Sequence, residues 1–504
     1  MVSDPSPHRP AAGTGNDAAP AAGAGGHHLA RSLGHGQMAM IAMGSALGTG
    51  LFLGSGAAIG VAGPAVIISF AIGALIAATI ALTMGEMASR HPVRGGFGTL
   101  AAHYLSPFWG YLTRFLYWFV TVAVTGTELV ACSAYLEYWA PGVPMWAGIL
   151  LFAAVILVVN IVSVGSFGII EFMLSGVKVI AIFVFILVGL FLMFVGTPTN
   201  PAPQLTNLFD HGGFAPNGLI SIWIALSIVM FSFGGIELLS VTAAEAKDPA
   251  QSIRTAARTT MVRLAFFYVF SIGIVVALVP WQQAAEVGDS VAASPFVMVF
   301  DRLGVPGAAH ITNALVLIAA LSAANANLYA GSRMLQSLAS DRMAPKLLAR
   351  LSRRQVPVPA IALSSLGIVG AAVLAFSGVG GVFGYMMSLV VFSFLLVWVL
   401  ILVTYLRYAR RRDGLETFRV PAGSATAVVG LVGIAAVLST IVVVRDLQVA
   451  AIVGVPTVLL AVVLYVTIVR HRVDGGELAR TFAEADAMRG EAGEIRSGTV
   501  TTNR

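Results

Sequence analysis

Three ionisable side chains, Glu128, Lys178 and Glu237, lie inside long apolar stretches of this sequence, where they could carry protons. Placing such a side chain at the centre of a bilayer costs at least about 2.5 kcal/mol. A buried ionisable group is therefore a candidate for function by default. We expect Lys178 and Glu237 to take part in proton coupling, and Glu128 to lie beside a bound substrate.

Each of these residues also has a structural interpretation. Lys178 lies seven positions after Glu171, on the same helical face, so the two could form a structural ion pair. Alternatively, Lys178 is an amine that takes up and releases a proton during a functional cycle. Glu237 could carry a proton or brace an unwound backbone, and Glu128 could instead hydrogen-bond a neighbouring helix.

Two apolar segments are interrupted by small residues. The first, 40–56, contains Gly44, Gly48 and Gly50, and the second, 219–246, is interrupted at 231–235 by Phe-Ser-Phe-Gly-Gly. Glycine lowers helix stability by about 1 kcal/mol relative to alanine, and backbone freed at membrane depth must line a cavity. Paired breaks in two halves of a chain are typical of secondary transporters. The alternative is that Gly44 and Gly48 serve close helix packing.

The first break indicates the kind of ligand. Amide groups exposed at Gly48, Thr49 and Gly50 would attract an anion such as a carboxylate, and free carbonyl groups at the break ends would accept an ammonium group. Together they describe an α-amino acid. The phosphate-binding pattern GxxxxGK[ST] does not occur in the chain.

The composition excludes an ordinary soluble domain. Of the 504 residues, 58% are hydrophobic and only 10% are charged, against about 25% charged in soluble domains. The single cysteine, Cys132, leaves no intramolecular disulfide and no cysteine metal cluster. We expect no cofactor, no metal, no enzymatic activity and no nucleic-acid partner, and the sequence does not fix the oligomeric state.

About twelve apolar runs are long enough to span a membrane. They lie near 38–61, 63–85, 107–138, 146–163, 167–195, 218–244, 258–280, 309–338, 358–376, 379–406, 424–444 and 448–470. Basic residues gather near 90–94, 247–263, 333–354 and 407–419, whereas Arg302 and Arg445 fall on the other side. By the positive-inside rule both termini are cytoplasmic. We expect residues 1–32 and 473–504 to be disordered cytoplasmic tails.

Several motifs resemble the bacterial amino acid permeases of the APC superfamily. They are HGQMAMIAMGSALGTGLFLGSG (35–56), AGP (62–64), GEM (85–87), EF (171–172) with VKVI (177–180), GGIELLSVTAAEAKDP (234–249), SPFVMVFDRLGVP (294–306) and GSRML (331–335). The resemblance implies an all-α membrane domain over 33–472 with a leucine-transporter-like fold. Its 5+5 inverted repeat would comprise 38–195 and 218–406, followed by two additional helices over 424–470.

The resemblance also implies import of an amino acid across the cytoplasmic membrane by proton symport with alternating access. The substrate-binding residues it implies are Ser45, Gly48, Thr49, Gly50, Phe231, Ser232, Gly234, Gly235, Glu128 and Asn325. Lys178 occupies the place where sodium-coupled relatives hold a cation. Proline-type or aromatic amino acids are the favoured substrates. Sodium-coupled symport, amino acid exchange, a channel and a non-transporting sensor are the alternatives.

Overall fold

The computed structural model describes residues 35–162, 164–196, 202, 205–245, 249–285, 294–301, 307–412, 418–473, 476 and 482–483. Within these residues the chain is helical and contains no strand. The expected N-terminal tail, 1–32, lies outside the described residues, as does most of 473–504. Phe482 is described, and its ring stacks on His103 with the ring centroids 4.0 Å apart.

The chain is a multi-pass membrane protein. Ten helical stretches in its described part are long and apolar enough to cross a bilayer. They correspond to α4 (Val66–Arg90), α6 (Pro107–Glu137), α7 (Met145–Val162), α8 (Val164–Phe194), α11 (Pro249–Leu278), α14 (Ala308–Ser340), α15 (Val358–Ser364) with α16 (Leu366–Phe376), α17 (Val382–Ala409), α18 (Ser424–Leu438) and α19 (Arg445–Thr467).

The remaining two predicted spans are the two segments that the glycines were expected to interrupt. Segment 38–61 is divided into α1 (His35–Ala46), α2 (Thr49–Phe52) and α3 (Gly54–Ala62). Segment 218–244 is divided into α9 (Ile220–Ser232) and α10 (Leu238–Val241). Neither is a continuous span, because its backbone leaves the helix where small residues allow it to turn. The short helix α5 (Gly96–Tyr104) lies between two spans and was not anticipated.

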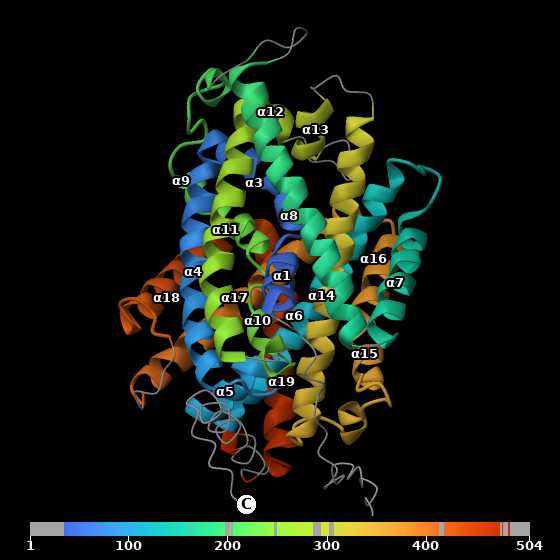
Figure 1. The fold of residues 1–504 in the computed structure, drawn as a ribbon, viewed down its shortest axis with the longest axis vertical. Helices are drawn as coiled ribbons and strands as arrows, with labels where there is room; N and C mark the ends of the chain where they lie inside the picture. The colour runs from blue at the N-terminus through green and yellow to red at the C-terminus, as the bar shows by residue number, and fades with distance from the viewer. Residues whose placement is uncertain are drawn as a thin grey trace, which may run out of the picture.

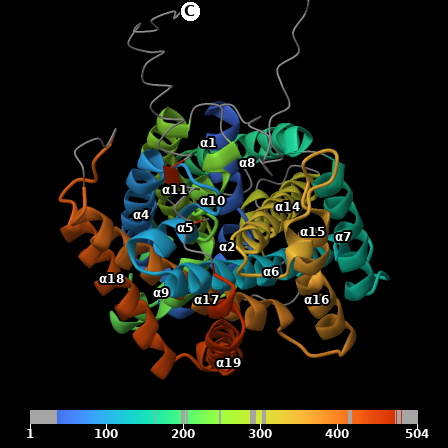
Figure 2. The same cartoon turned by 90° about the horizontal axis from the view of Figure 1, so that it is seen from below.

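The divided segments lie inside the helix bundle. Figure 2 shows α2 and α10 near the centre, with α7, α16, α18 and α19 at the periphery. Figure 1 shows α1 in front of α6, and Figure 2 shows it beside α11 and α8. Burial follows this arrangement, since α6 and α17 are mostly enclosed by protein whereas α19 is mostly exposed. Exposed apolar side chains, such as Val158 on α7 and Val463 on α19, present the surface that lipid requires.

Small residues allow the central helices to approach the outer ones closely. At Gly367 on α16, an added Cβ atom would lie 2.0 Å from the backbone oxygen of Val122 on α6. Gly370, three residues further along the same helix, has nothing within 4 Å of that position. The two glycines therefore differ in packing while sharing one helix.

We expect Gly367→Ala to lower the stability of the folded protein by about 1 to 3 kcal/mol, because backbone atoms must move apart to admit the methyl group. Gly370→Ala is the matched control, and it should leave stability unchanged or raise it by up to about 1 kcal/mol through helix propensity. Thermal unfolding of the purified variants in detergent measures the difference. Equal melting temperatures would contradict the close packing of α16 on α6.

Candidate functional site

The two helix breaks contact each other directly. The Ser45 hydroxyl at the end of α1 donates a hydrogen bond of 2.8 Å to the backbone oxygen of Gly235 in the second break. Gly235 has a φ of +98°, a conformation that favours glycine. On the other side, a Cβ atom added at Gly50 would lie 2.7 Å from the Cα atom of Ser232. The glycines are thus needed for the close approach of the two breaks.

A tyrosine from a third helix lies within hydrogen-bonding distance of backbone carbonyl groups at both breaks. The hydroxyl group of Tyr268 on α11 lies 2.7 Å from the carbonyl oxygen of Ala46 and 2.6 Å from that of Ser232. Tyr268 is fully buried. Its hydroxyl can donate to either carbonyl, and this links the end of α1 to the end of α9.

A small pocket lies between the breaks. Its lining residues are Ser45, Ala46, Gly48 and Gly50 from the first break, Phe231 and Gly234 from the second, and Val124, Glu128, Asn327 and Phe394 from α6, α14 and α17. Its free volume is about 10 Å³, space for about one water molecule. A larger ligand enters only if the surrounding helices or side chains move.

Glu128 faces this pocket rather than only a neighbouring helix. Its carboxylate oxygens lie 3.4 and 3.3 Å from the backbone nitrogen of Thr49, which donates to them. One oxygen is 2.6 Å from where a Cβ atom of Gly48 would lie. The carboxylate therefore holds the amide group at which an anionic ligand was expected to bind.

Glu237 lies behind the second break and braces it. One carboxylate oxygen accepts a hydrogen bond of 2.9 Å from the backbone nitrogen of Gly235, and the other accepts from the indole nitrogen of Trp398 on α17. The side chain is fully buried and does not line the pocket. Both oxygens have protein donors, so the geometry favours the bracing interpretation.

Lys178 reaches the first break from α8. Its ammonium group donates to the backbone oxygen of Gly44, a carbonyl near the C-terminal end of α1. The nearest carboxylate oxygen of Glu171 is 4.0 Å from Nζ, at the outer limit of an ion pair. The ammonium group of Lys178 thus contacts the backbone beside the first break, and the Glu171 carboxylate lies 4.0 Å from that ammonium group.

Asn325 is not among the residues that line this pocket, and neither are Thr49, Ser232 and Gly235. The amide oxygen of Asn325 accepts a hydrogen bond of 2.7 Å from Asn160, and its amide nitrogen donates to Glu171 at 3.3 Å. Asn327 lines the pocket instead. Two positions along a helix correspond to a rotation of about 200°, so these two residues face opposite sides of α14. Sequence reasoning also missed Val124 and Phe394, which carry no signal beyond being apolar.

Comparison with known proteins places the chain in a family. The model of the amino acid permease family matches residues 37–473. The chain belongs to the amino acid permease family. It is 38% identical over 390 residues to the aromatic amino acid transport protein AroP of Escherichia coli strain K12, covering 77% of this chain and 84% of the relative. It is 37% identical over 385 residues to the uncharacterized amino acid permease YvbW of Bacillus subtilis, covering 76% and 85%.

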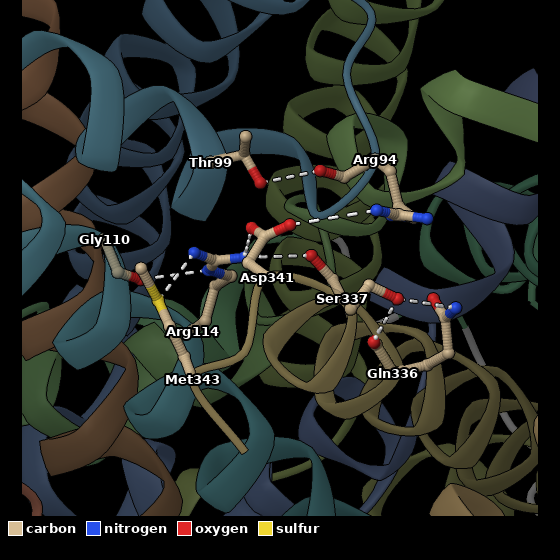
Figure 3. A network of polar contacts seen from close by, with 9 residues as sticks. Arg94, Thr99, Gly110, Arg114, Gln336, Ser337, Asp341 and Met343 are labelled. Atoms are coloured by element: carbon tan, nitrogen blue, oxygen red, sulfur yellow. Dashed lines mark hydrogen bonds and ion pairs between the residues drawn. The ribbon is translucent and has the colours of Figure 1, made fainter. Parts of the chain in front are cut away.

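The permease also contains a buried ionic network outside the pocket (Figure 3), which the sequence analysis did not find. Arg114 on α6 is fully buried and donates to Asp341 at 2.5 Å and to Ser337 at 3.1 Å. Arg94, between α4 and α5, approaches the other oxygen of Asp341 at 3.7 Å. This network joins α6, the end of α14 and the connection from α4 to α5.

We expect Gly50→Ala in the permease to weaken substrate binding by about tenfold or more, or about 1.4 kcal/mol. The added methyl group meets the backbone of Ser232 and forces the two breaks apart. Gly54→Ala is the matched control, because its methyl group would lie no closer than 3.4 Å from the Met387 sulfur. Binding of radiolabelled substrate to purified protein provides the measurement. Equal affinity in the two variants would show that the contact between the breaks is not needed for binding.

Proposed function

We propose that this permease imports an aromatic amino acid across the cytoplasmic membrane by proton symport with alternating access. The observation that carries the proposal is the meeting of two interrupted segments around one pocket, with a lysine bonded to the backbone of the first break. Sodium-coupled symport and amino acid exchange use the same pocket and differ in coupling. A sensor would bind the amino acid without net flux.

The pocket offers both ends of an α-amino acid a partner. The amide groups around Gly48, Thr49 and Gly50 suit the carboxylate, and carbonyl groups of the second break suit the ammonium group. Those of Ser232 and Gly235 now accept from Tyr268 and Ser45. Glu128 holds the Thr49 amide in the present structure. The substrate carboxylate therefore competes with Glu128 for this donor, and Glu128 must move for the substrate to bind.

Aromatic substrates are supported by the pocket walls and by the relatives. Phe231, Phe394 and Val124 form an apolar part of the lining, against which a ring packs favourably. The ring of Phe383 lies against that of Phe231, with centroids 6.2 Å apart. Relatives from Escherichia coli and Salmonella are named as aromatic amino acid transport proteins.

Lys178 is proposed as the principal proton-coupling residue. A protonated lysine places a positive charge at the carbonyl end of α1, where the family resemblance implies a sodium ion in sodium-coupled relatives. Loss of the proton weakens this contact, because an ammonium group is a stronger donor than an amine. Proton release at Lys178 is thereby linked to movement of the break that forms the pocket. Glu237 serves as a brace in this scheme.

The proposed topology has both termini in the cytoplasm and an inverted repeat of 38–195 and 218–406, with helices over 424–470 outside the repeat. The interrupted segment opens each half, as in transporters built from such repeats. Arginine and lysine residues near 90–94, 333–354 and 407–419 fall on the proposed cytoplasmic side.

Uptake in a host stripped of its own permeases tests the function. We expect labelled phenylalanine, tyrosine or tryptophan to accumulate against its gradient and a protonophore to abolish this accumulation, because the proton gradient supplies the energy. Proline serves as the comparison substrate. Accumulation that survives the protonophore and follows external sodium would contradict proton symport.

Substitution of Lys178 tests the coupling assignment. Lys178→Met should abolish accumulation, because the side chain no longer binds a proton, and Lys178→Arg should fail as well, because arginine stays charged. Lys346→Met, at an exposed lysine after α14, is the matched control and should accumulate substrate normally. A Lys178→Met protein that concentrates substrate at the wild-type rate would reduce the lysine to a structural role.

A further inference from the structure

The carboxylate of Glu171 is the centre of a polar cluster that the proposed mechanism does not yet use. The side chain is fully buried on α8. One oxygen accepts from the hydroxyl group of Ser322 at 2.5 Å and lies 3.4 Å from that of Ser175. The other oxygen accepts from the amide of Asn325 at 3.3 Å. Donors from α8 and α14 therefore hold the carboxylate in place without help from Lys178.

The cluster continues away from the pocket. Asn160, which is 2% exposed, donates to Asn325 at 2.7 Å and lies two residues before the end of α7. The last carbonyl of α7, at Val162, accepts from Arg354 in the connection after α14 at 3.4 Å. Polar side chains thus extend from Glu171 through Asn325 to Asn160, near the end of α7 that the proposed topology places in the cytoplasm.

Two carboxylates in this part of the protein differ in what they contact. Glu171 lies 4.0 Å from the ammonium group of Lys178, and Glu128 accepts from the backbone amide of Thr49. Glu128 lines the substrate pocket, whereas Glu171 does not. The Gly44 carbonyl on α1 is a direct partner of Lys178, and Ser322 and Asn325 on α14 are partners of Glu171. One carboxylate therefore faces the substrate and the other faces the proposed cytoplasmic exit.

The geometry of Lys178 and Glu171 differs from that of a simple structural ion pair. In a direct charged pair, nitrogen and oxygen are about 2.7 to 2.9 Å apart, but here they are 4.0 Å apart while Nζ donates to the Gly44 carbonyl. The distance of 4.0 Å between Nζ and the Glu171 oxygen must shorten for a proton to pass between them. Movement of α1 away from α8 removes the Gly44 carbonyl and leaves Glu171 as the remaining partner.

We propose that Glu171 is a second coupling residue, which accepts the proton from Lys178 and releases it on the side where α7 ends. This rests on the proton symport proposed above. In the transfer, one N–H bond of the ammonium group breaks and an O–H bond forms on Glu171. The products are a neutral amine and a neutral carboxylic acid, and the net charge of the pair stays zero. No charge has to enter or leave the apolar interior during this step.

Measuring two modes of transport distinguishes a coupling role of Glu171 from a purely structural role. Exchange of external labelled for internal unlabelled substrate needs pocket and conformational change but no net proton transfer, whereas accumulation needs the proton. Glu171→Gln keeps the size of the side chain and one acceptor oxygen, but it accepts no proton. We expect it to lose accumulation completely while its exchange rate stays within about twofold of wild type. Glu171→Asp keeps the acid group and should still accumulate substrate.

One control variant accompanies these measurements. Glu137→Gln applies the same substitution to an exposed carboxylate, and it should accumulate substrate.

The outcomes distinguish this inference from the function on which it rests. If a protonophore leaves wild-type accumulation intact, both the proposed proton symport and the proposed role of Glu171 are wrong. If wild type responds but Glu171→Gln still accumulates, only the role of Glu171 is overturned. Parallel loss of exchange and accumulation in Glu171→Gln would also overturn it, in favour of a structural ion pair. Should Glu171→Gln not reach the membrane, Glu171→Asp decides, because its failure to accumulate contradicts the proposal.

Discussion

Backbone groups that leave a helix at membrane depth must find partners inside the protein, because the bilayer offers none. Two segments of this permease leave the helix side by side, and most of the buried chemistry described above answers that requirement. The Gly235 carbonyl accepts from Ser45, and Tyr268 serves the carbonyl groups of both breaks. Lys178, Glu128 and Glu237 satisfy Gly44, Thr49 and Gly235. The ionisable residues thus have a structural role at the breaks in addition to their proposed roles in transport.

The same backbone groups stabilise the fold through internal hydrogen bonds and are the groups that we propose bind the substrate. In the proposed site, the substrate carboxylate takes the Thr49 amide that Glu128 now holds, and the ammonium group takes carbonyl oxygens that now have partners within the protein. Binding therefore replaces internal hydrogen bonds by bonds to the ligand, and the net gain is smaller than the number of new contacts suggests. Such a site gains selectivity, because a ligand that lacks either charged end leaves a buried group without a partner.

The sequence predicted those parts of the structure that follow from local chemistry. Gly44, Gly48 and Gly50 mark the first break because glycine destabilises a helix wherever it lies, and the pair Gly234 and Gly235 marks the second. The apolar runs gave the remaining helices. Contacts between distant segments could not be predicted in this way. Arg114 pairs with Asp341 across 227 positions, and the choice of Asn327 over Asn325 depends on how α14 is rotated against its neighbours. Residue types alone specify neither which distant residues pair nor how a helix is rotated about its axis.

The small size of the pocket has a consequence for ion permeation. A space for about one water molecule cannot hold a continuous file of water or a hydrated ion between the two sides of the membrane. In this conformation the pocket between the breaks therefore offers no water-filled path for ions.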